Sequence, residues 1–341
     1  MELQINKFNF HQDDHCWVEE TQCDEYINNT HCEGCGGVMT EIVRVQNDKG
    51  IVGIAHGLCE SCGYIKATRN LKLDVLNKHF SKKWLNMRTF DDFKVVDSVY
   101  KILEPYIDKK THKRVLDVGC GNGDKLSYFE REGFEAFGIE PSQTRTDAAR
   151  KYLKKSNIQT GFAKEYLEEV EQGFDIIYIE NVLQFTDDPF LLFDLAASKL
   201  NKGGLLYIRA QRFDYSSFSM FSMLSLIRSY VSLYTLKSYI IKNKLNIVFF
   251  SNNPFVLVMK KDGKLNDETV KILENAPKVN FDDVKKAAQA EFSSKLSGLT
   301  KSVTIKKKSM KRSMHFKILS KVVSFPIKII SNNDKLPIIL K

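Results

Sequence analysis

The sequence lacks an uninterrupted apolar run of about eighteen residues, the length that a transmembrane helix requires. Its opening residues, MELQINKFNFHQDD, also lack the apolar core of a secretory signal peptide. We therefore expect a cytoplasmic protein. With 341 residues, 43% of them hydrophobic, the chain is long enough for one sizeable α/β domain with appendages. Charged residues make up 27%, an ordinary share that excludes neither an enzyme nor a binding protein.

Most of the chain also lacks an excess of positive charge, although the formal net charge of the whole protein is +9. Residues 301–341 hold eleven Lys and Arg and one acidic residue, Asp334, which leaves 40 basic and 41 acidic residues in 1–300. An enzyme acting on nucleic acid usually lines its cleft with basic residues that neutralise phosphates. The distribution favours a small-molecule or glycan substrate and makes nucleic acid a less favoured partner.

The basic tail needs a separate explanation. A basic cluster, KKKSMKR, precedes Phe316–Phe325, where a helical wheel separates lysines and serines from a wide apolar face, and Pro326 would end that helix. This combination predicts peripheral contact with an anionic membrane at the cytoplasmic face. A helix packed on the protein core and an RNA-binding arm remain as alternatives.

Four of the seven cysteines form two pairs, Cys32-Glu-Gly-Cys35 and Cys59-Glu-Ser-Cys62. Two such turns supply four thiolates, the tetrahedral set that a structural Zn²⁺ prefers, and four ligands leave no open position for catalysis. EIVRVQ and IVGIAHG between the pairs alternate like the strands of a hairpin. A disulfide pair, a redox motif and four unrelated buried thiols are the competing interpretations.

The centre of the chain alternates between predicted strands and helices. Val115–Gly119 is a short buried strand, and Cys120–Asp124 is a glycine-rich turn into a helix, where backbone amides can approach a ligand closely. A dinucleotide fingerprint would need a third glycine at Asp124 and an apolar residue at Asp117. S-Adenosylmethionine carries an ammonium and a sulfonium and no phosphate, so an acidic residue suits it.

A second strand, Ala136–Ile139, ends at Glu140, where a carboxylate can bind ribose hydroxyls. The alternative for Glu140 is an ordinary acid at a helix N-terminus. The remaining predicted strands are Ile158–Ala163, Phe174–Ile179, Leu205–Ala210, Leu245–Phe250 and Phe255–Lys260, the last two as an antiparallel hairpin at the edge of the sheet.

The stretch VLDVGCGNGDKLSYFEREGFEAFGIEPS, followed by FDIIYIENVLQFTDDP and LNKGGLLYI, resembles the core of class I methyltransferases that use S-adenosylmethionine. CEGCGG, CESCGYI and LDVLNKHFSKKW resemble the zinc-binding domain that precedes this core in bacterial sugar C-methyltransferase-like proteins. The resemblance implies a Rossmann-like α/β fold, with a seven-stranded, mostly parallel sheet and an antiparallel edge strand, after a small zinc-ribbon-like domain. We expect an N-terminal segment at residues 1–28, this zinc domain at 29–70 and a helical connector at 71–111. The S-adenosylmethionine-binding domain is expected at 112–262 and a basic extension at 263–341.

The resemblance also implies which residues surround S-adenosylmethionine. We expect its methionine part to lie against Asp117, Gly119, Gly121 and Gly123, and its ribose against Glu140. We expect its adenine beside Phe162 or Ala163, and the far wall of its pocket at Asn181 and Val182. Relatives commonly carry a Glu-His pair after the fourth strand, where this chain has Gln184 and Phe185, which cannot act as a base. Gln184 is either a polar residue of the pocket wall or a substrate ligand. Four further residues are expected near the same sheet edge: Tyr178, Glu180, Asp187 and Tyr215. None of them is distinctive as a base, so the catalytic residue is unknown.

The segment that begins at Phe213 is longer than one crossover helix needs. It is either a lid over an acceptor pocket or a pair of buried helices.

Three functions agree with the sequence. The first is a methyltransferase acting on a sugar nucleotide, a glycan or another small molecule in surface polysaccharide biosynthesis. The second is an RNA or protein methyltransferase that grips its substrate with the zinc ribbon and tail, and the third is a protein that binds S-adenosylmethionine without catalysis.

Overall fold

The computed structural model describes residues 5–6, 26–46, 52–72, 95–211, 227–252, 254–284, 326–327 and 338–340. The chain divides into two compact units. Unit 1 comprises residues 1–72, 213–228 and 279–341, and unit 2 comprises 73–212 and 229–278. The predicted tail helix at 316–325, Tyr215 and much of the predicted lid segment lie outside the described residues. Among the helices that are described, none combines the length and the apolar character needed to span a bilayer.

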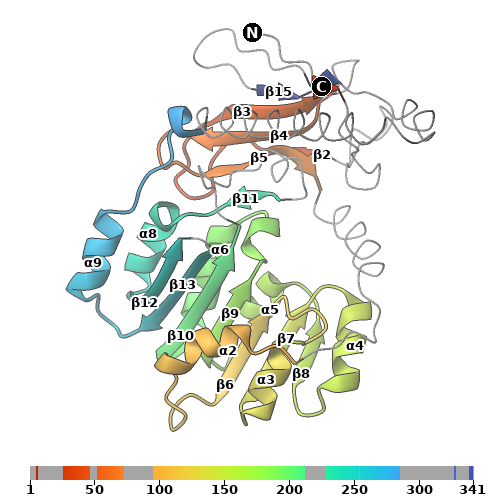
Figure 1. Ribbon diagram of the computed structural model, residues 1–341, viewed down its shortest axis with the longest axis vertical. Coiled ribbons are helices and arrows are strands. Elements are labelled where there is room, and N and C mark those ends of the chain that lie inside the picture. Colours follow the sequence, from red (N-terminus) through yellow and green to blue (C-terminus); the bar gives the residue numbers. More distant parts are fainter. Residues whose placement is uncertain are drawn as a thin grey trace, which may run out of the picture. The chain divides into compact units, whose positions relative to one another are not determined.

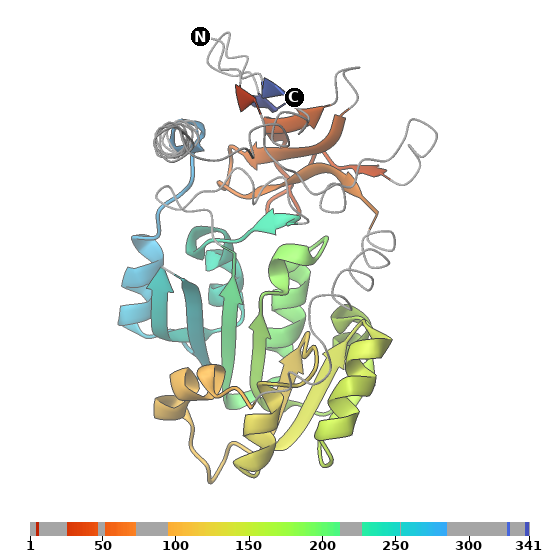
Figure 2. The same ribbon diagram turned by 45° about the vertical axis from the view of Figure 1, so that its right-hand side comes forward.

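Unit 2 is built on a seven-stranded sheet in the order β12-β13-β10-β9-β6-β7-β8 (Figures 1 and 2). The strands are β6 (Arg114–Val118), β7 (Glu135–Glu140), β8 (Asn157–Thr160), β9 (Phe174–Glu180), β10 (Leu200–Ala210), β12 (Leu245–Asn252) and β13 (Phe255–Lys261). β13 pairs antiparallel with both β10 and β12, whereas β6, β7, β8, β9 and β10 pair in parallel. The predicted Rossmann-like sheet and its antiparallel edge hairpin are confirmed.

Helices connect these strands and cover the sheet. They are α2 (Ser98–Leu103), α3 (Leu126–Arg131), α4 (Gln143–Tyr152), α5 (Ala163–Glu169), α6 (Pro189–Ser198), α8 (Leu233–Lys242) and α9 (Asp267–Glu274), with short 3-10 turns η4 (Glu104–Tyr106) and η5 (Leu183–Phe185). α2 and α3, which lie in front of the sheet in Figure 1, bury Tyr100, Leu103 and Phe129 against one of its faces. Asp188 caps α6 by accepting hydrogen bonds from the amides of Phe190 and Leu191. Parallel strands joined by such helices bring all the strand carboxyl ends to one edge of the sheet.

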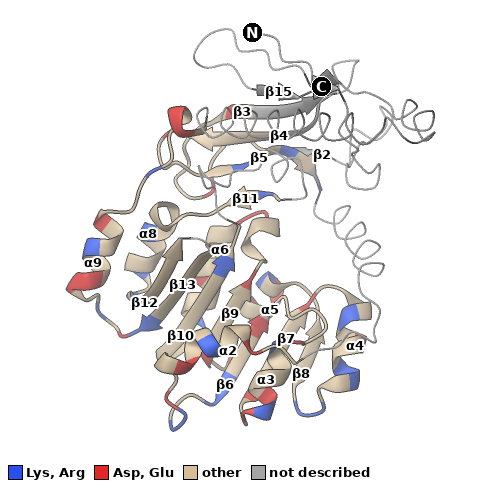
Figure 3. Cartoon of the chain, in the orientation of Figure 1, with Lys and Arg blue, Asp and Glu red and all other residues tan. Residues whose placement is uncertain are grey.

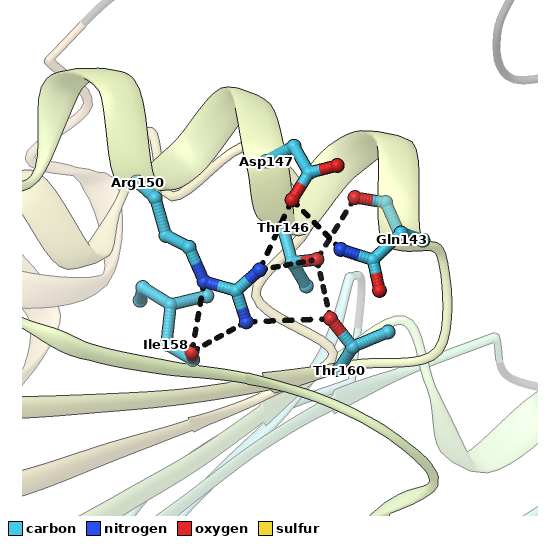
Figure 4. Close-up of polar contacts among 6 residues, drawn as sticks. All are labelled: Gln143, Thr146, Asp147, Arg150, Ile158 and Thr160. Carbon is cyan, nitrogen blue, oxygen red and sulfur yellow. Dashed lines mark hydrogen bonds and ion pairs between the residues drawn. The ribbon is translucent and has the colours of Figure 1, made fainter.

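α4 is fastened to the edge strand β8 by a polar network (Figure 4). Arg150 donates from Nε and Nη2 to the carbonyl of Ile158, at 3.2 and 2.9 Å, and the hydroxyls of Thr146 and Thr160 lie 2.6 Å apart. These bonds satisfy a strand carbonyl at a sheet edge and tie the middle and the last turn of α4 to β8.

Unit 1 contains a sheet in which β2 (Tyr26–Asn28) pairs with β5 (Ile65–Leu71), β5 with β4 (Val52–Cys59), β4 with β3 (Met39–Gln46), and β3 with β15 (Ile338–Leu340). The hairpin predicted between the two cysteine pairs is present as β3 and β4, paired from Met39 opposite Cys59 to Gln46 opposite Val52. Two further short strands pair with each other, β1 (Ile5–Asn6) and β14 (Pro326–Ile327). β11 (Ser229–Tyr230) belongs to unit 2.

Candidate functional site

The turn between β6 and α3 is shaped by three glycines. Gly119, Gly121 and Gly123 have φ angles of +81°, +55° and +79°, a region that side chains with a Cβ rarely adopt. The amides of Gly119 and Cys120 both donate to the carbonyl of Ile139, which ties the turn to β7. The predicted glycine-rich turn is therefore present, and its backbone follows the carboxyl ends of two adjacent parallel strands.

Close packing excludes side chains at two of these glycines. A Cβ on Gly119 would lie 2.4 Å from Cγ2 of Val182, and a Cβ on Gly123 would lie 2.4 Å from Cδ1 of Leu153. At Gly121 the nearest atom would be Nη1 of Arg145, at 3.3 Å. Val182 thus lies directly against the turn, and its place in the wall of a cofactor pocket stays a prediction.

Asp117, in β6, is only 4% exposed. The hydroxyl of Tyr178 in β9 donates a 2.7 Å hydrogen bond to Oδ2 of Asp117. Burial raises the pKa of Asp117 to about 7, although the Tyr178 hydrogen bond and the charge of Lys125 both lower it. A buried carboxylate with this pKa can ionise at neutral pH when a cation binds beside it.

Glu140, the last residue of β7, is 7% exposed. Oε2 accepts a hydrogen bond from the amide of Gly121, and Oε1 accepts one from the amide of Ser142, both at 3.1 Å. Burial raises the pKa of Glu140 above its usual range, against the opposing charge of Arg145. Each carboxylate oxygen has a second acceptor position left, so the side chain can still accept bonds from a pair of hydroxyls.

The other residues predicted to line the cofactor lie along the same sheet edge. Phe162 precedes α5 and is 45% exposed, and Ala163 is the first residue of that helix. Gly161 donates to the carbonyl of Glu140, which brings this segment to the end of β7. Asn181 has a φ of +58°, and its amide donates to the carbonyl of Arg209. The structure thus gathers the predicted residues at the ends of β6, β7, β8 and β9, while their roles in binding stay predictions.

Neither Tyr178 nor Glu180 is free to act as a general base. Tyr178 is fully buried and already donates to Asp117, and burial raises its pKa far above the ordinary value. Glu180 is ion-paired to Lys125 and Arg209. Gln184 is 4% exposed, and its Oε1 is buried without a hydrogen-bond partner in the part of the chain that the structure describes. A buried acceptor of this kind is costly unless a ligand satisfies it.

The ion-paired cluster around Glu180 was not anticipated from the sequence. Glu180 ends β9, Lys125 immediately precedes α3, and Arg209 lies near the carboxyl end of β10. The available signal was that Glu180 and Arg209 directly follow the buried runs 176–179 and 205–208. Charge at such a position is expected to have a partner or a function.

In unit 1 the four paired cysteines converge on one point. Their sulfur atoms all lie within 4.8 Å of one another, with Cys32 and Cys62 at 3.6 Å and Cys35 and Cys59 at 3.4 Å. These separations are too long for a disulfide of about 2.05 Å. They approach the roughly 3.8 Å between ligands of a tetrahedral ion with bonds of about 2.3 Å to sulfur. The four cysteines can therefore hold a zinc ion.

Backbone geometry and charge support that fit. Gly36 and Gly63, which follow the two cysteine pairs, have φ angles of +73° and +71°, and their amides donate to the carbonyls of Cys32 and Cys59. The pKa of Cys32 is lowered to about 5, chiefly by a hydrogen bond from the Cys62 thiol, whose own pKa is raised. At least one thiolate, the form that binds metals, is thus available at neutral pH.

Comparison with known proteins matches the central part of the chain to methyltransferases. The family model described as a methyltransferase domain matches residues 91–239. The chain is 29% identical over 109 residues to a ubiquinone biosynthesis O-methyltransferase of Nitrobacter winogradskyi, over 31% of this chain and 42% of that protein. The corresponding protein of Bradyrhizobium diazoefficiens is 28% identical over 109 residues, 31% of this chain and 43% of that one. The chain spans less than half the length of these curated relatives.

Solved structures with a related arrangement also carry methyltransferase descriptions. The plantazolicin methyltransferase BpumL, in complex with a pentazolic desmethylPZN analog and SAH, is 20% identical, with a TM-score of 0.42 over 55% of this chain and 92% of that one. CalS10, an amino pentose methyltransferase of Micromonospora echinaspora described with SAM bound, is 13% identical, with a TM-score of 0.40 over 56% and 98%.

The parallel strands β6 to β10 and the glycine turn all lie within residues 91–239, which the family model matches. The resemblance to class I methyltransferases is thereby confirmed, whereas the likeness to zinc-containing sugar C-methyltransferases stays a prediction. Residues 91–239 of the chain match the model described as a methyltransferase domain, and they form the central part of a Rossmann-like methyltransferase fold.

Proposed function

We propose that the protein transfers the methyl group of S-adenosylmethionine to a small molecule, and that this acceptor is a sugar nucleotide or glycan used in surface polysaccharide synthesis. The observation that carries the proposal is the pair of buried carboxylates, Asp117 and Glu140, near the carboxyl ends of adjacent parallel strands and beside the three-glycine turn. Asp117 suits the cationic methionine part, and the free acceptor positions of Glu140 suit the ribose.

Methyl transfer is an in-line displacement at a sulfonium, so positioning alone supplies much of the rate enhancement. The residues of this chain would hold the two reactants and exclude water, and the three-glycine turn would bind the cofactor. An oxygen or carbon acceptor still needs a base, and none of the described residues is assigned that role here.

The charge distribution favours a small acceptor over RNA. In unit 2, Lys and Arg are interspersed with Asp and Glu on α3, α4 and α9 (Figure 3). Interspersed charge gives a weaker attraction for a polyanion than a continuous basic face does. Methylation of RNA or protein, and cofactor binding without catalysis, are the alternative outcomes of the experiments below.

The zinc site completes the proposal. Cys32, Cys35, Cys59 and Cys62 would hold one structural Zn²⁺ in unit 1, and the four thiolates would saturate the ion. The ion would stabilise the fold and take no part in methyl transfer.

The decisive test is transfer of label from methyl-labelled S-adenosylmethionine to fractionated nucleotide sugars, glycans, RNA and protein. We expect label in the nucleotide-sugar or glycan fraction. Glu140→Ala should weaken cofactor binding roughly ten- to a hundredfold, because it removes about 1.5–3 kcal/mol of charge-assisted hydrogen bonds. Glu135→Ala, at the exposed opposite end of β7, is the matched control and should leave affinity unchanged. Label in RNA or protein would assign the acceptor to that class, and cofactor binding without transfer would indicate a non-catalytic protein.

Cofactor affinity should also depend on pH. Because the pKa of Asp117 is raised to about 7 in the protein without cofactor, the carboxyl must lose its proton before it can pair with the cationic cofactor. We expect affinity to increase as the pH rises through about 7. Calorimetry across this range should show the increase in the wild type and a flat profile in Asp117→Asn. Tyr178→Phe removes a hydrogen bond that lowers this pKa, so the midpoint should move to higher pH; an unchanged midpoint would contradict the assignment.

A further inference from the structure

Glu180 lies between two cations. Its side chain is 5% exposed, with Oε2 at 2.6 Å from Nζ of Lys125 and Oε1 at 2.9 Å from Nη1 of Arg209. One carboxylate thus holds two positive charges, and the cluster carries a net charge of +1. An ion pair that served only to neutralise a buried carboxylate would need one cation.

The guanidinium of Arg209 is ion-paired on one side and exposed on the other. Within the described residues, the contact that the guanidinium makes is the one from Nη1 to Glu180, while the side chain is 41% exposed. Its remaining N–H donors are available to a ligand. The backbone is also fixed, because the carbonyl of Arg209 accepts a hydrogen bond from the amide of Asn181. A guanidinium oriented in this way can bind a carboxylate or phosphate through two parallel hydrogen bonds.

The position in the sheet indicates which ligand. The residues predicted to bind adenine, ribose and methionine follow β8, β7 and β6 in that order along the sheet edge, so the methyl group would face β9 and β10. Arg209 lies on β10, opposite Glu180 in the strand register and two strands from Asp117. Neighbouring strands lie about 4.8 Å apart, so the Arg209 backbone lies roughly 10 Å from that of Asp117 across the sheet and two residues, about 7 Å, farther toward the carboxyl end.

We propose that Arg209, oriented by Glu180 and supported by Lys125, binds an anionic group of the methyl acceptor, a phosphate or a carboxylate. This inference rests on the proposed function, because it takes the end of β10 as the acceptor side of the cofactor. It narrows the acceptor to an anionic small molecule. A nucleotide sugar supplies phosphates, and an acidic sugar supplies a carboxylate.

The test is calorimetric binding of inorganic pyrophosphate to the full chain, with and without S-adenosylhomocysteine. We expect the wild type to bind pyrophosphate at millimolar concentration or below, and Arg209→Gln to weaken this binding roughly ten- to a hundredfold. Arg131→Gln, an exposed arginine at the far end of α3, is the matched control and should bind like the wild type. S-Adenosylhomocysteine should bind equally well to all three proteins.

Arg209→Lys covers the case in which Arg209→Gln does not fold, because it keeps the charge and the pairing with Glu180 while losing the planar fork. It should weaken pyrophosphate binding less than Arg209→Gln does. Absence of pyrophosphate binding in the wild type, or equal binding in the Arg209 variants, would overturn the inference and leave the proposed function intact. A loss confined to S-adenosylhomocysteine affinity would assign Arg209 to the cofactor carboxylate instead. Failure of the wild type to bind S-adenosylhomocysteine would count against the proposed function, and the pyrophosphate titration of the free protein would still test the subsite.

Discussion

Gly119→Ala is expected to reduce affinity for S-adenosylmethionine roughly a hundredfold or more. The new Cβ would lie 2.4 Å from Cγ2 of Val182, far inside van der Waals contact, so either Val182 or the turn must move. The backbone is also held at a φ of +81°, where a Cβ costs about 1–2 kcal/mol. Both changes act on the turn that would hold the methionine part of the cofactor. Calorimetric titration gives the affinity, and thermal unfolding separates it from loss of stability.

Gly133→Ala is the control that separates backbone strain from the steric clash. Gly133 has a φ of +89°, and a Cβ there would meet nothing within 4 Å. This variant should lose about 1–2 kcal/mol of stability and keep its cofactor affinity. If Gly119→Ala behaved like Gly133→Ala, the turn would not be the cofactor site.

Local signals in the sequence were sufficient for much of unit 2. Val115–Val118 and Phe174–Ile179 are short, mainly apolar runs with one aspartate each, and buried parallel strands have a mainly apolar composition. The glycine turn was predictable because only glycine tolerates the backbone angles that such a turn needs. The β3–β4 hairpin followed from alternation of apolar and polar residues around a polar turn.

Strand ends were less predictable, because tertiary contacts set them. β10 starts at Leu200, five residues before the predicted Leu205, and near this start the side-chain Nδ2 of Asn201 donates to Oδ1 of Asp175 at 2.8 Å. β8 ends at Thr160 and not at Ala163. The next amide, that of Gly161, bonds back to the carbonyl of Glu140, and α5 begins at Ala163. Both differences arise from long-range partners that local propensity does not contain.

The cluster of Lys125, Glu180 and Arg209 was missed for a related reason. Glu180 and Arg209 are 29 residues apart and meet because β9 and β10 pair in a particular register. The spacing of apolar residues in a single sequence predicts the buried faces of helices and strands, but no such spacing predicts ion pairs between strand ends.

Removal of the four-cysteine site should have the largest effect on unit 1. Cys59 is fully buried, and Cys59→Ser would replace a thiolate with a hydroxyl, a much poorer zinc ligand. Structural zinc contributes about 10–16 kcal/mol in small zinc-binding peptides, which equals or exceeds the whole stability of most domains, about 5–15 kcal/mol. We therefore expect Cys59→Ser to lose its metal and the cooperative unfolding of unit 1. Metal analysis and thermal unfolding measure the two effects.

Cofactor affinity distinguishes a structural ion from a catalytic one. Asp117, Glu140 and the glycine turn belong to unit 2, whereas all four cysteines belong to unit 1, so Cys59→Ser should bind S-adenosylmethionine like the wild type. Ser61→Ala changes an exposed residue in the same turn and should retain one zinc per chain with unchanged unfolding. Treatment of the wild type with a strong chelator should reproduce the Cys59→Ser result, because both remove the ion that closes the cluster. Full zinc content and unaltered unfolding in Cys59→Ser would show that the four sulfurs do not form a metal site.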